Sequence, residues 1–211
     1  MFSGILPVAR ISADGEDSRF RDIRGSPPKF FCAFMIQATW VSLCLMPILA
    51  INALPASTFA ALGTAVSITD LIGLLLYVGR LGFEVTADRQ KSAWVQEKKD
   101  KIHEDFLMRG LWSKSRHPNY FGESMLWTGI ATLAAGVLTC GAGTAGMGLS
   151  AGLAGKATAL LAAGIIPAFV TFLLLKVSGV PLSENKYDKK YGDREDYKKW
   201  KRETPMFIPK L

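Results

Sequence analysis

The residue types most suited to chemistry lie in residues 110–123, which spell Gly-Leu-Trp-Ser-Lys-Ser-Arg-His-Pro-Asn-Tyr-Phe-Gly-Glu. Pro118 suits the first turn of a helix, where its missing N–H costs nothing, so we expect a membrane-spanning helix to begin there. The free N–H groups at a helix start favour a phosphate, and Arg116 can bind phosphate oxygens through two parallel hydrogen bonds. The alternative is an interfacial anchor with its basic and aromatic side chains among the headgroups. The residues alone favour these two interpretations equally.

A second set of polar residues lies along the helix expected over residues 67–87 and continues just beyond its end. Its members are 7, 3, 4, 4 and 3 residues apart, which places them on one helix face. The set comprises Asp70, Tyr77, Arg80, Glu84, Asp88 and Lys91. Ionisable residues inside a membrane are costly and are usually functional or paired. The pattern therefore predicts either a polar cavity wall open to the cytoplasm, or a plain Arg80–Glu84 pair with Asp88 and Lys91 among the headgroups.

The C-terminal tail, residues 181–211, interleaves basic and aromatic residues. One interpretation is an amphipathic segment that lies on anionic lipid. The other is a lid that adds lysine and tyrosine side chains to a phosphate-bearing cofactor. Nucleic-acid binding is disfavoured, because RNA recognition would require stacking aromatic residues on a folded platform.

The apolar elements that must position these residues form four stretches. A span needs about 20 mostly apolar residues. The stretches long enough are residues 30–51, 67–87, 120–138 and 158–180. A soluble bundle is the alternative, but the uncharged run 30–51 is difficult to cover with protein in a chain of 211 residues.

The charges predict how these spans are oriented. The chain is 49% hydrophobic with a formal net charge of +7, yet 22 of its 25 Lys and Arg residues lie in residues 1–29, 88–118 and 182–211. Four spans place these three blocks on one side, and basic residues favour the cytoplasmic face. We therefore predict an all-α, polytopic membrane helix bundle in the lipid bilayer, with both termini cytoplasmic and no nucleic-acid partner.

Two domains follow from this arrangement: a cytoplasmic N-terminal segment, residues 1–29, and a membrane domain, residues 30–211, that includes the tail. No cleavable signal peptide is evident, which fits the endoplasmic reticulum if the source is eukaryotic. Residues 134–164 form a Gly/Ala/Thr-rich tract that we interpret as a flexible external loop. The three cysteines lack metal-ligand spacing, so no metal site is predicted.

Several motifs, in order along the chain, resemble those of one family. They are Gly82-Phe83-Glu84, Asp88-Arg89-Gln90-Lys91, residues 115–123, Ser178-Gly179-Val180-Pro181-Leu182 and residues 197–209. On these motifs the chain resembles the steroid 5-alpha-reductase C-terminal superfamily, in particular its DUF1295 branch. Relatives usually carry further spans upstream of residues 15–40, so we expect a shortened relative or a truncated sequence.

The resemblance implies a pocket for NADPH and the reduction of a carbon–carbon double bond in an apolar lipid, sterol or enone. The residues that it implies contact NADPH are Glu84, Asp88, Lys91, Arg116, His117, Asn119, Glu184, Asn185, Lys186, Tyr187 and Tyr191. An acid would polarise the substrate carbonyl during hydride transfer. Tyr120 or Tyr77 is the candidate proton donor, and Glu123 the candidate residue that orients it.

Two other functions stay open. Isoprenylcysteine and phospholipid methyltransferases, which use S-adenosylmethionine, share an Arg-His-Pro-x-Tyr-x-Gly pattern that is present at residues 116–122. They typically carry a Glu-Glu pair after the last span, where this chain has Glu184-Asn185. The third possibility is a non-catalytic membrane protein that keeps the fold as a binding or scaffolding subunit.

Overall fold

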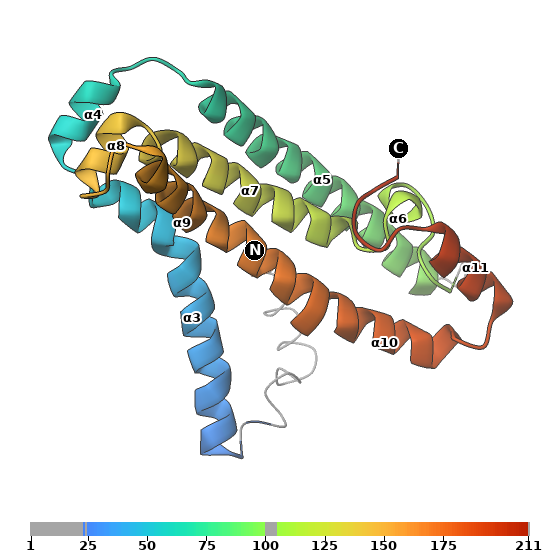
Figure 1. The fold of residues 1–211 in the computed structure, drawn as a ribbon. Coiled ribbons are helices and arrows are strands. Elements are labelled where there is room, and N and C mark those ends of the chain that lie inside the picture. Colours follow the sequence, from blue (N-terminus) through green and yellow to red (C-terminus); the bar gives the residue numbers. More distant parts are fainter. Residues whose placement is uncertain (1–22, 24, 100–104, 211) are drawn as a thin grey trace. The chain divides into compact units, whose positions relative to one another are not determined.

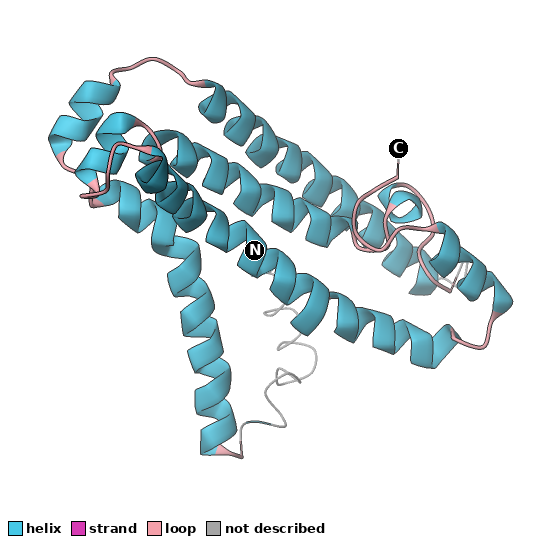
Figure 2. Ribbon diagram, viewed as in Figure 1, coloured by secondary structure: helices cyan, strands magenta, loops and turns pink. Residues whose placement is uncertain are grey.

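The computed structural model describes residue 23, residues 25–99 and residues 105–210. All regular structure in these ranges is helical (Figure 2). The chain divides into two compact units, residues 1–46 and residues 47–211. The all-α fold class predicted from the sequence is confirmed.

The first unit holds most of helix α3 (Pro27–Asn52), which continues past Pro47 into the second unit. Beyond Lys29 this helix has no charged residue, and large apolar side chains such as Phe31 and Ile36 are exposed. A helix that is apolar on all sides suits lipid rather than water. The predicted span over residues 30–51 lies entirely within α3.

The second unit is built on α5 (Ile68–Lys99), α7 (Pro118–Leu138) and α9 (Leu153–Phe172), and α7 packs against both of the others (Figure 1). α5 and α7 approach closely where two glycines face each other. A Cβ atom built on Gly129 would lie only 2.8 Å from the backbone oxygen of Gly73. Small residues at such crossings let helix backbones pack tightly inside a membrane.

The helix that starts with α9 continues into a π-helical turn, η2 (Leu173–Val177), and then into α10 (Val180–Tyr191). Single π-helical turns occur often beside functional sites. The change of helical geometry falls at residues 173–179, where α10 leaves the apolar segment and the charged tail begins. α10 carries the first acidic and basic side chains of the tail.

The Gly/Ala/Thr tract is more ordered than the sequence analysis predicts. Helix α8 (Gly141–Gly146) forms inside it, and α9 already begins at Leu153. Leu138, Ala159 and Ala163 are buried in one cluster with Leu54, beside the short helix α4 (Ala56–Leu62). The expectation of a flexible loop is wrong, because small side chains allow close helix packing as well as flexibility.

Three described helical segments are long and apolar enough to cross a bilayer: Pro27–Asn52, Pro118–Leu138 and Leu153–Tyr191. They contain three of the four predicted spans. The fourth, residues 67–87, belongs to α5, a helix of 32 residues with several charged side chains and a low mean hydropathy. The fold class is that of a helical membrane bundle, in which α7 packs against α5 and α9. The crossing of the membrane by α5 stays a prediction.

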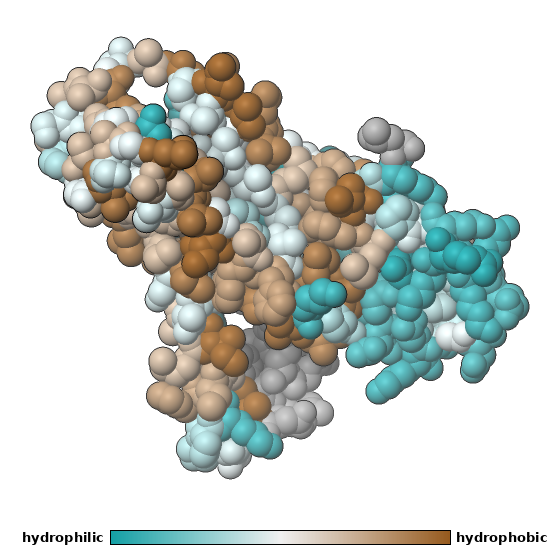
Figure 3. Space-filling model, viewed as in Figure 1, coloured by the Kyte–Doolittle hydropathy of each residue, from teal (hydrophilic) through white to brown (hydrophobic). Residues whose placement is uncertain are grey.

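The polar end of the second unit contains α6 (Leu111–Lys114) and α11 (Glu195–Glu203). Hydrophilic residues gather over α11 and the end of α10, whereas hydrophobic residues are frequent over α5 and α9 (Figure 3). The apolar side of α11 is used inside the protein. Tyr197 is buried with Phe106 and Tyr191, and Trp200 packs on the same cluster. The tyrosines of the tail and Trp200 therefore belong to a small core, and Phe207 packs on Phe121, so these rings do not form a face free to lie on lipid.

Candidate functional site

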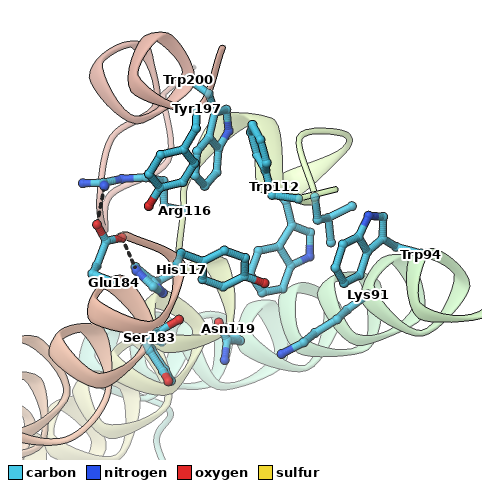
Figure 4. A pocket seen from close by; sticks show the side chains of 14 residues that line it. Lys91, Trp94, Trp112, Arg116, His117, Asn119, Ser183, Glu184, Tyr197 and Trp200 are labelled. Carbon is cyan, nitrogen blue, oxygen red and sulfur yellow. Dashed lines mark hydrogen bonds and ion pairs between the residues drawn. The ribbon is translucent and has the colours of Figure 1, made fainter. Parts of the chain in front are cut away.

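A cavity lies at the polar end of the second unit, where α5, α6, α7, α10 and α11 meet (Figure 4). It holds about 610 Å³ of space outside protein atoms, including the part that is open to solvent. Its lining comprises Lys91, Trp94, Phe106, Leu107, Trp112, Arg116, His117, Asn119, Tyr120, Ser183, Glu184, Tyr187, Tyr197 and Trp200.

The carboxylate of Glu184 is the centre of the charged network in this cavity. Arg116 Nη1 lies 2.6 Å from Glu184 Oε2, and His117 Nε2 lies 2.9 Å from Glu184 Oε1 (Figure 4). Lys201 Nζ, from α11, lies 3.1 Å from the same Oε2 atom. Glu184 thus connects α10 to the start of α7 and to the tail helix.

A second carboxylate, one helical turn further along α10, completes the contact with α11. Asp188 Oδ1 accepts hydrogen bonds from Lys201 Nζ at 2.5 Å and from the Tyr197 hydroxyl at 2.8 Å. Burial, together with the neighbouring Asp188 carboxylate, raises the pKa of Tyr197. Burial lowers the pKa of Lys201, but hydrogen bonds to Asp188 and Glu184 outweigh it and leave that pKa above its ordinary value. Both groups therefore keep their protons at neutral pH.

The C-terminal residues hold the Arg116 segment in place. The backbone N–H of Arg116 donates to Pro205 O at 2.9 Å, and the Ser115 hydroxyl donates to Phe207 O at 2.8 Å. The N–H of Lys210 donates to Lys114 O at 2.9 Å. Residues 204–210 therefore form a strap across the loop that carries Arg116, although the two segments are far apart in sequence.

Two aromatic rings and a glycine define the wall beside α7. The rings of His117 and Tyr120 are stacked with centroids 5.3 Å apart. A Cβ atom on Gly179 would lie 3.1 Å from Tyr120 Cε2 and 2.7 Å from the backbone oxygen of Leu174. Only glycine therefore fits at the break before α10, because a larger residue would push against Tyr120 or the π-helical turn.

Two buried N–H donors on the cavity residues have no hydrogen-bond partner among the described residues. They are Arg116 Nε and Trp200 Nε1. A buried donor without a partner costs free energy, and such groups in native proteins usually have a reason. The same is true of Arg80 Nε and Trp40 Nε1, on residues that do not line the cavity.

Half of the site residues predicted from the sequence lie together in this cavity. These are Lys91, Arg116, His117, Asn119, Tyr120, Glu184 and Tyr187. They come from α5, from α7 and the two residues that precede it, and from α10, so the tertiary structure brings together three motifs that are separate in the sequence. Lys91 also lies 5.5 Å from the ring centroid of Trp112, a cation–π distance.

The remaining predicted residues do not line the cavity. Tyr77 and Asp88 on α5 are exposed, as are Asn185 and Lys186 on α10. The hydroxyl of Tyr191, in the aromatic cluster, donates to Asp105 O at 2.9 Å. Glu84 and Glu123 belong to a different group of charges.

That group lies between α5 and α7 and is centred on Arg80, whose exposed fraction is 5%. Arg80 Nη2 lies 2.6 Å from Glu84 Oε2 and 3.4 Å from Glu123 Oε2. Trp127 Nε1 donates to Glu123 Oε1 at 2.9 Å. At the start of α5, Asp70 accepts hydrogen bonds from the backbone N–H and the hydroxyl of Ser67. The polar stripe of α5 therefore serves several separate structural contacts, and Lys91 is its one member in the cavity lining.

The aromatic part of the cavity and the role of Lys201 were not predicted from the sequence. Trp94, Phe106, Trp112, Tyr197 and Trp200 all line it. The sequence of α11 could have indicated the residues that this helix contributes, because Trp200 and Lys201 follow Tyr197 by three and four residues and so share one face of the helix. No local pattern marks Phe106 or Trp112, which reach the cavity only through the fold.

Residues 4–204 match the sequence model of a protein family described as DUF1295, a protein family of unknown function. Because the match covers nearly the whole chain, the chain belongs to this family. Searches of curated proteins and of solved structures found no match.

Proposed function

We propose that the chain is a membrane-embedded reductase that uses NADPH to reduce a carbon–carbon double bond in an apolar lipid, sterol or enone. The observation that carries this proposal is the composition of the cavity. It combines two cations, Lys91 and Arg116, with the hydroxyl of Tyr120 and several aromatic rings. Cations bind phosphates, rings stack on flat heterocycles, and a hydroxyl can supply a proton.

The residues present fit a phosphate-bearing nucleotide. Arg116 offers a buried N–H without a partner among the described residues, and Trp200 offers a second one. Trp94 and Trp112, which also line the cavity, present rings that could contact a base or a nicotinamide. NADPH, when bound, supplies the hydride. Only a part of so large a cofactor would lie inside the cavity, and the rest would extend through its open side.

We propose that Tyr120 is the proton donor that polarises the substrate carbonyl. Its ring is fixed by the stacked ring of His117, and His117 is in turn held by Glu184. Glu123, the orienting residue expected from the sequence, is engaged by Trp127 and Arg80 instead. We therefore propose that His117 positions Tyr120 and that Glu123 stabilises the packing of α5 against α7.

Location supports the same proposal. The cavity lies at the end of the second unit that carries described residues of the basic blocks 88–118 and 182–211, which is the cytoplasmic end if the charge rule holds. NADPH would then enter from the cytoplasm, and an apolar substrate would enter from the lipid through the helices. The endoplasmic reticulum is the membrane that we propose for a eukaryotic source.

Binding of the cofactor tests the proposal directly. Three of the five tryptophans, Trp94, Trp112 and Trp200, line the cavity, so a ligand there should quench the fluorescence of the protein in lipid nanodiscs. We expect quenching by NADPH and none by S-adenosylmethionine, which has no phosphate. Arg116→Gln should weaken NADPH binding at least about tenfold, since a hydrogen bond to a charged group contributes about 1.5–3 kcal/mol.

Arg109→Gln is the matched control for that experiment. Arg109 is half-exposed, pairs with Glu97 and does not line the cavity, so NADPH affinity should stay unchanged. Quenching by S-adenosylmethionine alone would instead indicate a methyltransferase. Binding of neither molecule would indicate a non-catalytic protein that retains the fold.

A further inference from the structure

Arg116 and His117 form a seat for one anionic group, and in this structure the carboxylate of Glu184 fills it. One carboxylate oxygen contacts Arg116 Nη1 at 2.6 Å, and the other contacts His117 Nε2 at 2.9 Å. Both seat residues precede the first turn of α7, a helix of 21 residues. The occupant comes from a different helix, α10, and not from a neighbouring position in the chain.

The seat has binding capacity that Glu184 leaves unused. The side chain of Arg116 is nine-tenths buried, with 10% of it exposed. Its Nε atom is buried and has no hydrogen-bond partner among the described residues. A guanidinium carries five N–H donors in a planar fork, and a phosphate offers more acceptor oxygens and more charge than one carboxylate.

A second cation, Lys201, lies beside Glu184 and would pair with its carboxylate if a ligand took its place at Arg116 and His117. Lys201 Nζ already lies 3.1 Å from Glu184 Oε2, the atom that contacts Arg116. Lys201 Nζ also donates hydrogen bonds to both carboxylate oxygens of Asp188, at 2.5 and 2.7 Å, and these fix its position. Glu184 could thus leave the seat and keep an ionic partner, which avoids the high cost of a buried unpaired charge.

We propose that Glu184 is an exchangeable internal anion: a phosphate group of a ligand binds Arg116 and His117, and the Glu184 carboxylate moves to Lys201. This inference deepens the proposed function, because it concerns the same cavity, but it needs neither a nicotinamide nor a hydride. Lys201 acts as the receiver of the displaced carboxylate. The apparent affinity for a phosphate-bearing ligand is then set by competition with Glu184.

Titration with inorganic pyrophosphate tests the exchange in nanodiscs of zwitterionic lipid, with tryptophan fluorescence as the readout, because Trp112 and Trp200 line the cavity. Glu184→Gln keeps the size of the side chain and removes its charge. We expect it to bind pyrophosphate about tenfold more tightly than the unaltered chain, a change of about 1.4 kcal/mol. Unchanged or weaker binding by Glu184→Gln would overturn the proposal.

Glu195→Gln is the matched control, because it removes the same charge from the same tail. Glu195 is exposed, pairs with Lys198 and does not line the cavity. We expect its pyrophosphate affinity to match that of the unaltered chain. An equal gain in both variants would mean that net charge alone controls binding, and that result would also overturn the exchange.

A double-mutant cycle isolates the role of Lys201. If Lys201 receives Glu184, Lys201→Gln should weaken pyrophosphate binding about tenfold in the unaltered chain, or about 1.4 kcal/mol. The same substitution in the Glu184→Gln background should change the affinity less than about twofold. Equal weakening in both backgrounds would show that Lys201 attracts the phosphate directly, which contradicts its role as receiver.

A measurement that leaves Glu184 intact covers the case in which its variant does not fold. The chain has two histidines, and His103→Gln, at a position outside the described residues, leaves His117 as the only imidazole. Pyrophosphate should shift the ¹⁵N signal of His117 as its partner changes from carboxylate to phosphate. An unmoved signal at saturation would overturn the exchange. A shift without any NADPH binding would support the seat and reject the reductase.

Discussion

Two arginines of the second unit have similar immediate surroundings and different positions. Arg80 and Arg116 each have a carboxylate oxygen at 2.6 Å and a buried Nε without a hydrogen-bond partner among the described residues. Arg80 lies within the packed pair of α5 and α7. Arg116 lies where five elements meet, and it lines a cavity. Both arginines are therefore closely paired with a carboxylate, but only Arg116 has open space for a ligand beside it.

The partners of the two arginines explain the difference. Arg80 is paired with Glu84 on its own helix and with Glu123 on the adjacent one, so helix packing alone brings them together. Arg116 is paired with Glu184, which is 68 residues away, and is held by the C-terminal strap. A group assembled from distant segments can change when one of them moves, whereas the Arg80 group cannot change without separating two helices. We infer a structural role for the first group and a binding role for the second.

The largest expected effect is on the Arg80 group. Arg80→Leu would leave the carboxylates of Glu84 and Glu123 close together without their shared cation. Breaking a buried ion pair in this way costs about 3–5 kcal/mol. We expect the free energy of unfolding in detergent to fall by about that amount. Arg89→Leu, an exposed arginine on the same helix, should change it by less than about 0.5 kcal/mol.

The next largest effect is expected at Tyr120, one of the two tyrosines that are candidate proton donors from the sequence. Tyr120 lines the cavity, and Tyr77 is exposed on α5. If the proposed function holds, Tyr120→Phe should lower the rate of NADPH oxidation with an enone lipid about 100-fold, the usual contribution of general acid catalysis. Tyr77→Phe should leave the rate unchanged. The reverse order of the two rates would contradict the assignment of the cavity.

A smaller effect is expected from the glycine beside Tyr120. Gly179→Ala would bring a methyl group within 2.7 Å of Leu174 O and 3.1 Å of Tyr120 Cε2, so it should lower the free energy of unfolding by about 1–3 kcal/mol. Gly82→Ala on α5 is the control, since nothing lies within 4 Å of its Cβ position. That control should be neutral or stabilising by up to about 1 kcal/mol. Thermal unfolding of the two variants side by side measures this difference, and equal stabilities would contradict the close contact at Gly179.

The smallest effect concerns the aromatic core of the tail. Tyr197→Phe removes the hydrogen bond to Asp188 and should cost about 1 kcal/mol at neutral pH. The raised pKa of Tyr197 means that the folded chain keeps this proton where the unfolded chain has lost it. That contribution is therefore present below about pH 10 and is lost as the pH rises above it. The unfolding free energy of Tyr197→Phe should fall less steeply between pH 9 and 11 than that of the unaltered chain, a range that spans the ordinary tyrosine pKa of about 10. Equal slopes would contradict the stated cause.

The elements could be predicted well from the sequence, and the reasons are local. The uncharged run in α3 and the proline at the start of α7 each identify an element from adjacent residues alone. The Gly/Ala/Thr tract could not be assigned in this way, because small residues are compatible with a loop and with close helix packing. Its buried contact with Leu54 involves a segment that is far away in the chain.

The candidate site was predictable only in part. Arg116, His117 and Tyr120 stand in one short segment, so their proximity follows from the spacing of a helix start. Helical spacing also places Tyr77, Glu84 and Asp88 on the same face as Lys91, yet of these residues only Lys91 lines the cavity. A helix face is one side of a long cylinder, and its members meet different neighbours at different heights along it.

The sequence by itself determined that the chain is helical and suited to a membrane, because apolar length and charge blocks are properties of contiguous residues. It also determined that the start of α7 carries basic and proton-exchanging side chains. Only the tertiary structure decided that Glu184 and Lys201 meet Arg116, and that the final residues strap the loop holding it. The physical reason is that ion pairs and hydrogen bonds act over a few ångströms, so contacts across 68 or more residues depend on how the helices pack.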